Sequence, residues 1–195
     1  MTDPQQLWPR SATVAGIAMA IRWMEADDAT AVQRFAEAVP LHDLLFLQRD
    51  IRQPKVIEAW LQQIASGQIR SLLAVADVEV KGCTAIVRDE FSWSPHVAEI
   101  RVLTSPTMRR SGLGRLLAQD SLLAAQEQGV EKVFVRLTPD QGAALTVFED
   151  MGFHPEALLR DHVRDGAGQT HDIAIMALDL NRQSSRHEVF GMGTG

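Results

Sequence analysis

The chain has 195 residues, of which 46% are hydrophobic and 23% are charged, as expected of one folded domain with short tails. Its formal net charge of −6 argues against the basic face that nonspecific nucleic-acid binding requires, so no nucleic-acid partner is expected. The single cysteine, Cys83, excludes an internal disulfide, and no cysteine and histidine spacing predicts a metal site.

The start of the chain does not have the pattern of a signal peptide. An acidic residue and prolines stand where a basic segment followed by an apolar one would be needed. The apolar stretch over 12–20 is too short to cross a bilayer. We therefore expect a cytoplasmic protein with no membrane partner, in a compartment that keeps Cys83 reduced.

Hydrophobic spacing predicts alternating strands and helices along the middle of the chain. Helices are expected where apolar residues recur every three or four positions before a Pro or Gly, and strands where short runs are rich in Val, Ile and Leu. In chain order the expected elements are a strand over 20–26, helices from Asp27 or Asp28 to Pro40 and from Pro54 to Gly67, strands over 71–77, 82–89 and 97–104, a helix over 112–128, a strand over 131–138, a helix over 141–151, and strands over 157–165 and 171–180.

This order, β-α-α-β-β-β-α-β-α-β-β, predicts an α/β fold in which helices cover a mixed sheet. Residues 1–18 have no clear period and are expected to form an N-terminal extension. Residues 19–181 would form the single domain, and the polar, then glycine-rich residues 182–195 a flexible C-terminal tail.

One stretch, TSPTMRRSGLGRLL over 104–117, has the composition of a ligand loop. It is not a dinucleotide-binding fingerprint, because Leu117 stands where the third glycine is required, and it lacks the Gly-Lys-Ser/Thr ending of a Walker loop. Glycines before a helix let the backbone approach a ligand, and the first amides of the helix have no partner within it. With three arginines over 109–115, this pattern favours a di- or polyphosphate site. The alternative is a glycine-containing turn with solvated arginines.

Two segments resemble the GNAT superfamily of N-acetyltransferases. Arg109-x-x-Gly112-x-Gly114, after a strand and Pro106, is similar to the family's acyl-CoA pyrophosphate loop. The stretch from Gln141-x-x-Ala144 to Gly152-Phe153 resembles the family's Asn-x-x-Ala-x-x-x-Tyr-x-x-x-Gly-Phe segment. The element order matches the family's fold from about residue 20 to 180, which implies a mostly antiparallel sheet of about seven strands.

The resemblance implies that acetyl-CoA is the cosubstrate and that it binds between the strand over 97–104 and the glycine loop. In the family, the backbone of that strand holds the thioester and the pantetheine, so the side chains there need not be polar. Gln141 matches the family's Asn but is longer. The cofactor-binding residues implied in this way are Val102, Leu103, Thr104, Arg109, Arg110, Ser111, Gly112, Leu113, Gly114, Arg115, Gln141 and Phe148.

A general base is needed because an amine acceptor is protonated at neutral pH. Glu99 is the leading candidate, because family members commonly place an acid there that works through water; the alternative is a solvent-facing carboxylate paired with an arginine. His96, His162 and His171 are less favoured bases, since histidines on strands are more often surface or structural groups. Cys83 is a weak candidate for a covalent nucleophile, because its apolar strand offers no support for a thiolate.

The position of Phe148 departs from the family pattern, in which a tyrosine donates a proton to the leaving thiolate. Phe148 has no such proton, and the chain contains no tyrosine at all. Unassisted departure is tolerable, because a thiol of this kind has a pKa of roughly 8.5. The absence of the tyrosine nevertheless leaves a second hypothesis open, that the chain is a non-catalytic acyl-CoA-binding or sensing module. A third, a structural domain whose loop binds nothing, is disfavoured by the intact arginine and glycine spacing.

The sequence favours an acyltransferase that moves an acetyl group directly to a primary amine, of a small molecule or a peptide, in a ternary complex. Residues 41–70 and 90–96 are expected on the acceptor side, where Phe46, Phe91 and Trp93 could line a pocket or belong to the core. Edge strands of such a sheet can pair, so either a monomer or a homodimer is expected.

Overall fold

The computed structural model describes residues 7–181, so the predicted tail over 182–195 lies outside the described residues. Alternating and β-branched runs form strands, and the runs with helical spacing form helices. The strands are β1 (Arg10–Val14), β2 (Ile17–Trp23), β3 (Ile69–Arg70), β4 (Leu72–Ala76), β5 (Glu79–Val87), β6 (Val97–Thr104), β7 (Lys132–Leu137), β8 (His154–Arg164) and β9 (Thr170–Asp179). The helices are α1 (Ala29–Ala38), α2 (Pro54–Ala65), α3 (Leu113–Glu127) and α4 (Gly142–Asp150), with short 3₁₀ helices η2 (Ala26–Asp28), η3 (Leu41–Leu44) and η4 (Pro106–Met108).

All nine strands belong to one sheet, in the order β1-β2-β4-β5-β6-β7-β9-β8, with the short β3 paired to β5. Among the strands of residues 7–181, only β6 and β7 run parallel, and every other pair is antiparallel. The predicted class and element order are therefore confirmed. The sheet is wider than the seven strands expected, because β1 and β3 were not anticipated. β1 lies within the range expected as an N-terminal extension and pairs with β2 across its whole length.

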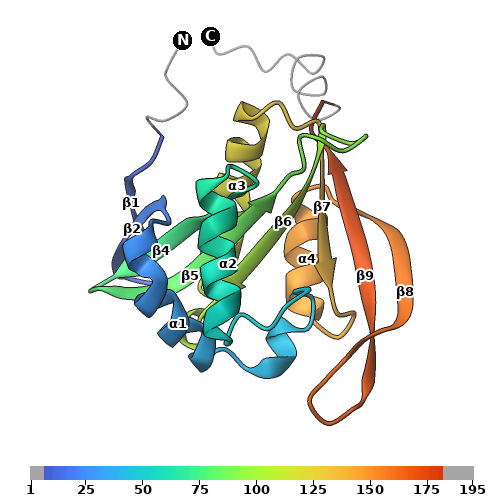
Figure 1. The fold of residues 1–195 in the computed structure, drawn as a ribbon, viewed down its shortest axis with the longest axis horizontal. Coiled ribbons are helices and arrows are strands. Elements are labelled where there is room, and N and C mark those ends of the chain that lie inside the picture. The colour runs from blue at the N-terminus through green and yellow to red at the C-terminus, as the bar shows by residue number, and fades with distance from the viewer. Residues whose placement is uncertain (1–6, 182–195) are drawn as a thin grey trace.

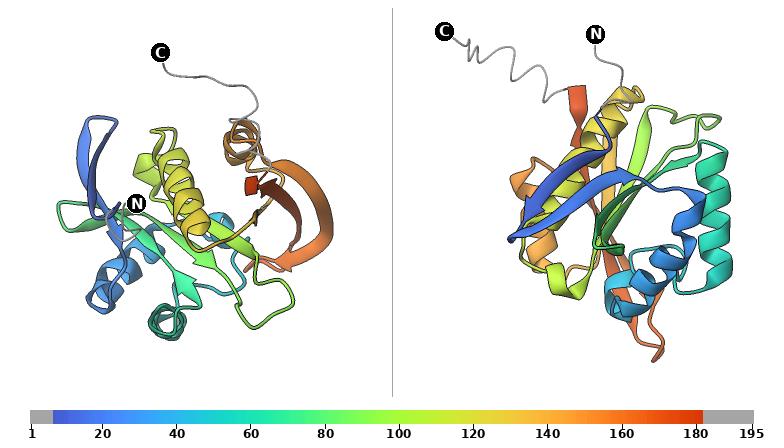
Figure 2. Two further views of the ribbon diagram at one scale, coloured as in Figure 1. Left: turned by 90° about the horizontal axis from the view of Figure 1, so that it is seen from above. Right: turned by 90° about the vertical axis from the view of Figure 1, so that its left-hand side faces the viewer.

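Helices cover both faces of the sheet (Figures 1 and 2). α1 and α2 lie on one face, and α3 and α4 lie on the other. Each face has its own core: Leu113 and Leu117 of α3 pack with Ile100 of β6, whereas Val32 of α1 and Trp60 of α2 pack on the opposite side. Successive side chains of β6 thus enter different layers.

The close packing of α3 depends on a glycine in β5. A Cβ atom added to Gly82 would lie 2.7 Å from Leu117 Cδ1 and 3.0 Å from the carbonyl oxygen of Leu103. The face of β5 that packs against α3 therefore has no room for a side chain at position 82. This contact fixes how the start of α3, and the loop before it, sits against β6.

The outer strand β8 is irregular. Its register against β9 shifts between Pro155 and Ala157 and again between Leu159 and Val163. Within the second irregularity Asp161 has a left-handed φ of 49°, and its N–H donates to Asp172 Oδ1 at 2.8 Å. β8 is therefore bulged rather than a continuous edge.

Candidate active site

β6 and β7 separate in the middle of the sheet (Figure 1). Their parallel pairing runs from Val97↔Lys132 to Glu99↔Phe134, while β6 stays paired with β5 as far as Thr104 and β7 with β9 as far as Leu137. Backbone N–H and C=O groups alternate between the two edges of a strand. Part of the backbone over Ile100–Thr104 therefore faces β7 without a strand partner, and Val102, Leu103 and Thr104 lie on this stretch.

The glycine loop leads from β6 through η4 into α3. Arg110 has φ 58° and Gly112 has φ 90°, so two left-handed residues turn the backbone just before the helix. Ser111 holds the turn, because its Oγ donates to the Met108 carbonyl at 2.7 Å and accepts from the Leu113 N–H at 3.2 Å. Only Gly112 among the loop glycines needs its conformational freedom, since a Cβ on Gly114 would make an ordinary contact of 3.8 Å with Thr104.

Four backbone N–H groups at this loop have no hydrogen-bond partner within residues 7–181, those of Arg110, Gly112, Gly114 and Arg115. Gly114 and Arg115 belong to the first turn of the 15-residue helix α3, Gly112 is the residue just before it, and Arg110 lies in the preceding turn. The helix dipole adds partial positive charge at this end. Successive free amides around left-handed residues form the kind of concavity that binds phosphate. The loop has the donors for an anionic ligand before any side chain is considered.

The three arginines of the loop have different surroundings. Arg109 is paired with Asp43 of η3, and Arg115 Nη1 lies 3.3 Å from Asp150 Oδ2 of α4. Arg110 is exposed and forms no ion pair with any described residue. The sequence identified the arginines, but it could not show that two of them already have acidic partners from distant elements.

Gln141 immediately precedes α4, and Phe148 lies within it. The carbonyl of Gln141 accepts the N–H groups of Ala144 and Leu145 at 2.9 and 3.1 Å. Phe148 is 7% exposed and packs edge-to-face on Phe153, with ring centroids 5.1 Å apart. Phe148 is therefore a core residue of the face covered by α3 and α4.

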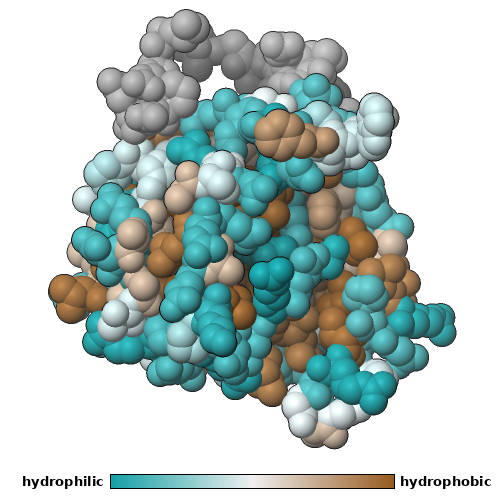
Figure 3. Space-filling model, in the orientation of Figure 1, coloured by the Kyte–Doolittle hydropathy of each residue, from teal (hydrophilic) through white to brown (hydrophobic). Residues whose placement is uncertain are grey.

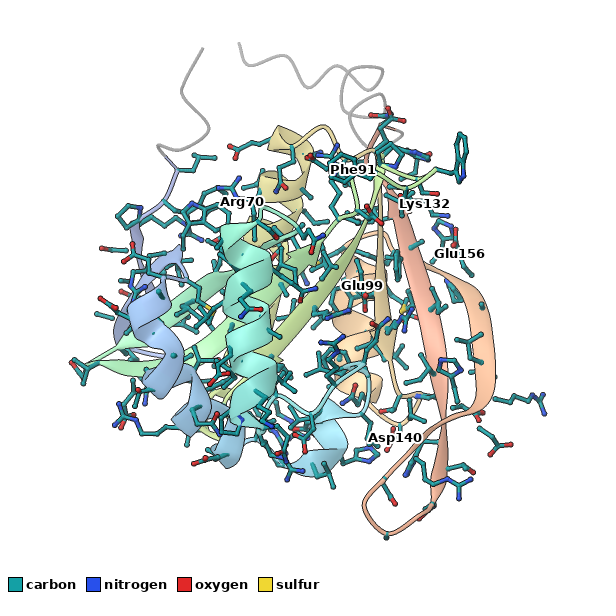
Figure 4. All side chains as sticks on the ribbon, viewed as in Figure 1. Arg70, Phe91, Glu99, Lys132, Asp140 and Glu156 are labelled. Atoms are coloured by element: carbon teal, nitrogen blue, oxygen red, sulfur yellow. The ribbon has the colours of Figure 1, made fainter. Side chains whose placement is uncertain are left out.

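Glu99 lies at the point where β6 and β7 diverge, and Figure 4 shows it in the centre of the face that carries α2. The side chain is buried, at 5% exposure. Its Oε2 accepts a hydrogen bond from Arg101 Nη2 at 2.7 Å. Its Oε1 lies 3.7 Å from Arg136 Nε but has no hydrogen-bond partner among the described residues. One carboxylate oxygen is thus held in place while the other is left for a water molecule or a substrate.

The histidines named as alternative bases do not meet at Glu99. His96 and His162 are exposed, and neither forms an ion pair with a described residue. His171 Nε2 lies 3.0 Å from Asp165 Oδ2, and its ring packs at 5.3 Å on that of His42. The hydrogen bond from His171 is the main cause of the lowered pKa of Asp165.

The structure adds a pair that the sequence did not suggest. His42 Nε2 of η3 lies 2.6 Å from Asp140 Oδ2. Asp140, which is labelled in Figure 4, lies in the turn between β7 and α4. The Thr138 hydroxyl, and then His42, lower the pKa of Asp140. Because about one hundred residues separate the partners, no local spacing could reveal the contact. Together with the Asp43–Arg109 pair, it connects η3 to the segments that follow the C-terminal ends of β6 and β7.

A cavity of about 140 Å³ lies between α2 and the middle of the sheet. Arg101 and Leu103 of β6 and Cys83 of β5 form part of its wall, and the rest comes from Thr84, Ala85, Val87 and from residues 47–69. The predicted acceptor region over 41–70 therefore does line a cavity. Phe46 is buried in the core instead, and Phe91 and Trp93 are fully exposed, at 96% and 102%. Figure 3 shows hydrophobic and hydrophilic side chains intermixed across this face of the molecule.

Cys83 is not equipped to act as a nucleophile. Burial raises the pKa of its thiol to about 12. A thiol with this pKa is almost entirely protonated at neutral pH, and the thiolate is the reactive form. The weak covalent alternative thus loses its physical basis.

No helix in the described part of the chain has the length and apolar composition needed to cross a membrane. The features gathered around β6 are a separated strand pair, four free amides at a helix start and a buried carboxylate. This arrangement suits a ligand with an anionic end at α3 and an extended part along β6.

Comparison with known proteins agrees with this geometry. Residues 18–153 match the model of the Acetyltransferase (GNAT) family. The [ribosomal protein bS18]-alanine N-acetyltransferases of Salmonella typhimurium and Escherichia coli are each 26% identical to the chain over 80 residues, which is 41% of this chain. The matched region spans about half (53%) of those relatives.

Solved structures show the same fold. A Salmonella typhimurium protein determined with its cofactor acetyl-CoA aligns with a TM-score of 0.72 at 20% identity, covering 83% of this chain and 94% of that one. The GNAT domain of a Streptomyces lividans protein aligns with a TM-score of 0.73 at 17% identity, covering 90% and 98%. Since the family model matches well over half of the residues, the chain is an enzyme that belongs to the Acetyltransferase (GNAT) family.

Proposed function

We propose that the chain transfers the acetyl group of acetyl-CoA to a primary amine, by direct attack within a ternary complex. The observation that carries the proposal is the separation of β6 from β7 between a set of free amides at one end and Glu99 at the other. The S18-alanine N-acetyltransferases named above act on an amine, which supports this class of acceptor.

The glycine loop would hold the pyrophosphate. The free N–H groups of Arg110, Gly112, Gly114 and Arg115 would donate to it, with Ser111 and Leu113 keeping the turn in place. Arg109 and Arg115 would contribute by exchanging part of their contact with Asp43 and Asp150 for the phosphates. Charge-assisted hydrogen bonds of this kind are roughly twice as strong as neutral ones.

The unpaired backbone of β6 would hold the rest of the cosubstrate. N–H groups over Val102, Leu103 and Thr104 that face β7 are available for the pantetheine and for the thioester oxygen. A backbone donor aimed at that oxygen stabilises the negative charge that develops on it during attack. Gln141 and Phe148 would border the same space from α4, Phe148 through apolar contact.

Glu99 would remove the proton from the attacking amine, directly or through a water molecule bound at Oε1. The amine nitrogen then forms a bond to the carbonyl carbon, the carbon–sulfur bond breaks, and the second proton that the nitrogen loses passes through water to the thiolate. Phe148 cannot donate that proton, and no tyrosine is present to replace it. Water is sufficient for a thiolate that is only weakly basic.

Binding of acetyl-CoA to the loop is tested by thermal unfolding. At a hundredfold excess over its Kd, a ligand stabilises the folded state by about 2.7 kcal/mol, which corresponds to a rise in Tm of roughly 5 to 10 °C for a domain of this size. Gly112→Asp is expected to abolish the rise, because it adds bulk and negative charge at the phosphates.

The matched control is Gly129→Asp, at the other end of α3. Gly129 also has a left-handed φ, of 73°, and a Cβ there would meet nothing within 4 Å. Both variants are expected to lose intrinsic stability, but the control should keep the full response to acetyl-CoA. An unchanged response in Gly112→Asp would remove the loop from the site. Release of free thiol with an amine panel then tests transfer itself.

A further inference from the structure

The cavity beside α2 points to a class of acceptor. We infer that it takes an amine that also carries an anionic group, an α-amino acid being the simplest case, and that it disfavours polyamines. The inference rests on the proposed function, since it assigns the acceptor side of the same reaction. It depends on the cavity's position, its charge and the state of its polar groups.

The cavity adjoins the proposed base. Glu99, Arg101 and Leu103 alternate with residues of the opposite core along β6, so their side chains share the α2 face. Arg101 and Leu103 form part of the cavity wall, and Arg101 is hydrogen-bonded to Glu99. An acceptor bound in the cavity would thus lie within reach of both the Glu99 carboxylate and the backbone of β6.

The charge of the wall is positive. Its lining residues include two arginines, Arg49 and Arg101, and no aspartate or glutamate. Glu99, which is hydrogen-bonded to the lining residue Arg101, is offset by Arg101 at 2.7 Å and by Arg136 at 3.7 Å. A diamine would therefore bring its second positive charge into a site with a surplus of cations, whereas a carboxylate would meet them.

The arginines have donors to spare. Arg101 uses one nitrogen for Glu99, while its Nε is buried and has no hydrogen-bond partner among the described residues. Arg49 is exposed and forms no ion pair within residues 7–181. A guanidinium group matches a carboxylate with two parallel hydrogen bonds, and a buried donor without a partner is costly. An anionic acceptor would supply the missing partner.

Two other polar groups of the wall have partners among the described residues, whereas Gln48 and Gln63, which also line the cavity, bring neutral amides and no charge. The Trp60 indole N–H donates to Ser71 Oγ at 2.9 Å, and the Thr84 hydroxyl accepts the Leu72 N–H at 3.1 Å. The apolar lining residues suit a short carbon skeleton. They are Leu47, Ile51, Val56, Ile69, Ala85, Val87 and Leu103.

The test compares amino acids with their own amides. The probes are the common α-amino acids, their carboxamides and 1,4-diaminobutane, and thiol release from acetyl-CoA is measured with each. The amide of each pair has the less basic amine, so more of it is uncharged and intrinsic reactivity favours the amide. We expect at least one amino acid to exceed its amide at least tenfold in kcat/KM.

Arg49→Gln should reduce kcat/KM for that amino acid at least fivefold, mainly through KM, and change the value for its amide less than twofold. Lys55→Gln is the matched control, because it removes one positive charge from the exposed part of α2 without altering the cavity wall. It should leave both substrates within twofold.

The inference would be overturned if the amides or the diamine reached the same kcat/KM as the amino acids. It would also be overturned if the Arg49→Gln variant still preferred the amino acid over its amide. If no amino acid is an acceptor, the inference is equally wrong. In each case a retained Tm response to acetyl-CoA, or transfer to another amine, would show that the proposed function stands without it.

Discussion

Glu99 has two carboxylate oxygens in different environments. Oε2 is fixed by Arg101, and Oε1 has no hydrogen-bond partner among the described residues although it is buried. Burial of an unsatisfied acceptor costs about 1–3 kcal/mol, so such an atom usually has a functional or solvent partner. This contrast between the two oxygens identifies Glu99 as the candidate base.

Glu99→Gln is expected to reduce turnover by about a hundredfold, because the amide keeps the shape and an acceptor for Arg101 but cannot take a proton. The measurement is thiol release at saturating acetyl-CoA with an amine that the wild type uses. The increase in Tm on adding acetyl-CoA should stay intact, which separates lost chemistry from lost binding. Wild-type turnover in this variant would contradict the assignment.

At this scale the sequence predicted the glycine loop and Glu99 but not their surroundings. Arg109, Gly112 and Glu99 stand out because each has a chemical or conformational property that is visible in the local sequence. The acidic partners of Arg109 and Arg115 are Asp43 and Asp150, and Glu99 lies near Arg136; all three come from other elements. Tertiary folding alone brings these partners close, so no spacing rule could identify them.

Among the secondary-structure elements, α3 depends most on a single position. Gly82→Ala would place a methyl group 2.7 Å from Leu117 Cδ1 and 3.0 Å from the Leu103 carbonyl oxygen. Overpacking of this kind typically costs 1–3 kcal/mol, so we expect the free energy of unfolding in urea to fall by about 2 kcal/mol.

The control is Gly142→Ala at the start of α4, where a Cβ meets nothing within 4 Å. It should leave stability unchanged or raise it by up to about 1 kcal/mol, since Ala is the better helix former. If the two variants were equally stable, the contact between α3 and β5 would be looser than described. A shift of α3 in Gly82→Ala should also weaken the Tm response to acetyl-CoA.

The start of α1 makes stability depend on pH. Asp28 accepts two hydrogen bonds from Arg22, at 2.7 and 2.6 Å, and one from the Glu25 N–H at 2.8 Å. The contact with Arg22 is the main reason that the pKa of Asp28 is lowered from 3.8. The stabilisation is present above that value and is lost as the pH falls through the lower folded pKa.

Asp28→Asn is therefore expected to reduce the free energy of unfolding by about 2 kcal/mol at pH 7. The difference from wild type should shrink when urea unfolding is repeated at pH 3, where the unfolded carboxylate of the wild type is mostly protonated. A constant difference at both pH values would mean that Asp28 stabilises the helix start by shape rather than by charge.

Most elements were predictable, because apolar spacing is a local property. β1 was missed for an identifiable reason: the sequence RSATV has little apolar content, and the turn that joins it to β2 is Ala15-Gly16. Both turn residues have left-handed φ values, of 50° and 79°, which Asn-Gly would have signalled far more clearly. β3 was missed because two residues carry no period.

For the molecule as a whole, the N-terminal hairpin is secured through a buried carboxylate on α3. Asp120, which is 4% exposed, accepts hydrogen bonds from Arg10 at 2.7–3.1 Å and from the Trp8 indole at 3.4 Å. Trp8 also packs edge-to-face on Trp23 of β2. The first strand is thereby joined to the helix whose start forms the glycine loop.

Asp120→Ala should lower the free energy of unfolding by about 2 kcal/mol, because Arg10 loses its partner. The loss is moderated because the Arg10 side chain is about one-third exposed and recovers some solvation. Asp150→Ala is the comparison, since its pair with Arg115 is exposed and should contribute less than 1 kcal/mol. Equal losses in chemical denaturation would show that burial does not distinguish the two pairs.

The bulge at Asp161 also affects how the sheet ends. An outer strand is a template on which a neighbouring chain can add its own strand, and long, flat edges lead to aggregation. In β8 the template is interrupted twice, near Pro155 and around Asp161, and Arg160, Asp161 and His162 follow one another at the second break. A strand from a second copy could therefore form backbone hydrogen bonds with only a few consecutive residues of β8 before a register shift interrupted the pairing. The edge next to the active-site half of the sheet is thus protected against uncontrolled growth, and a homodimer formed there would have to use side-chain contacts rather than a shared sheet.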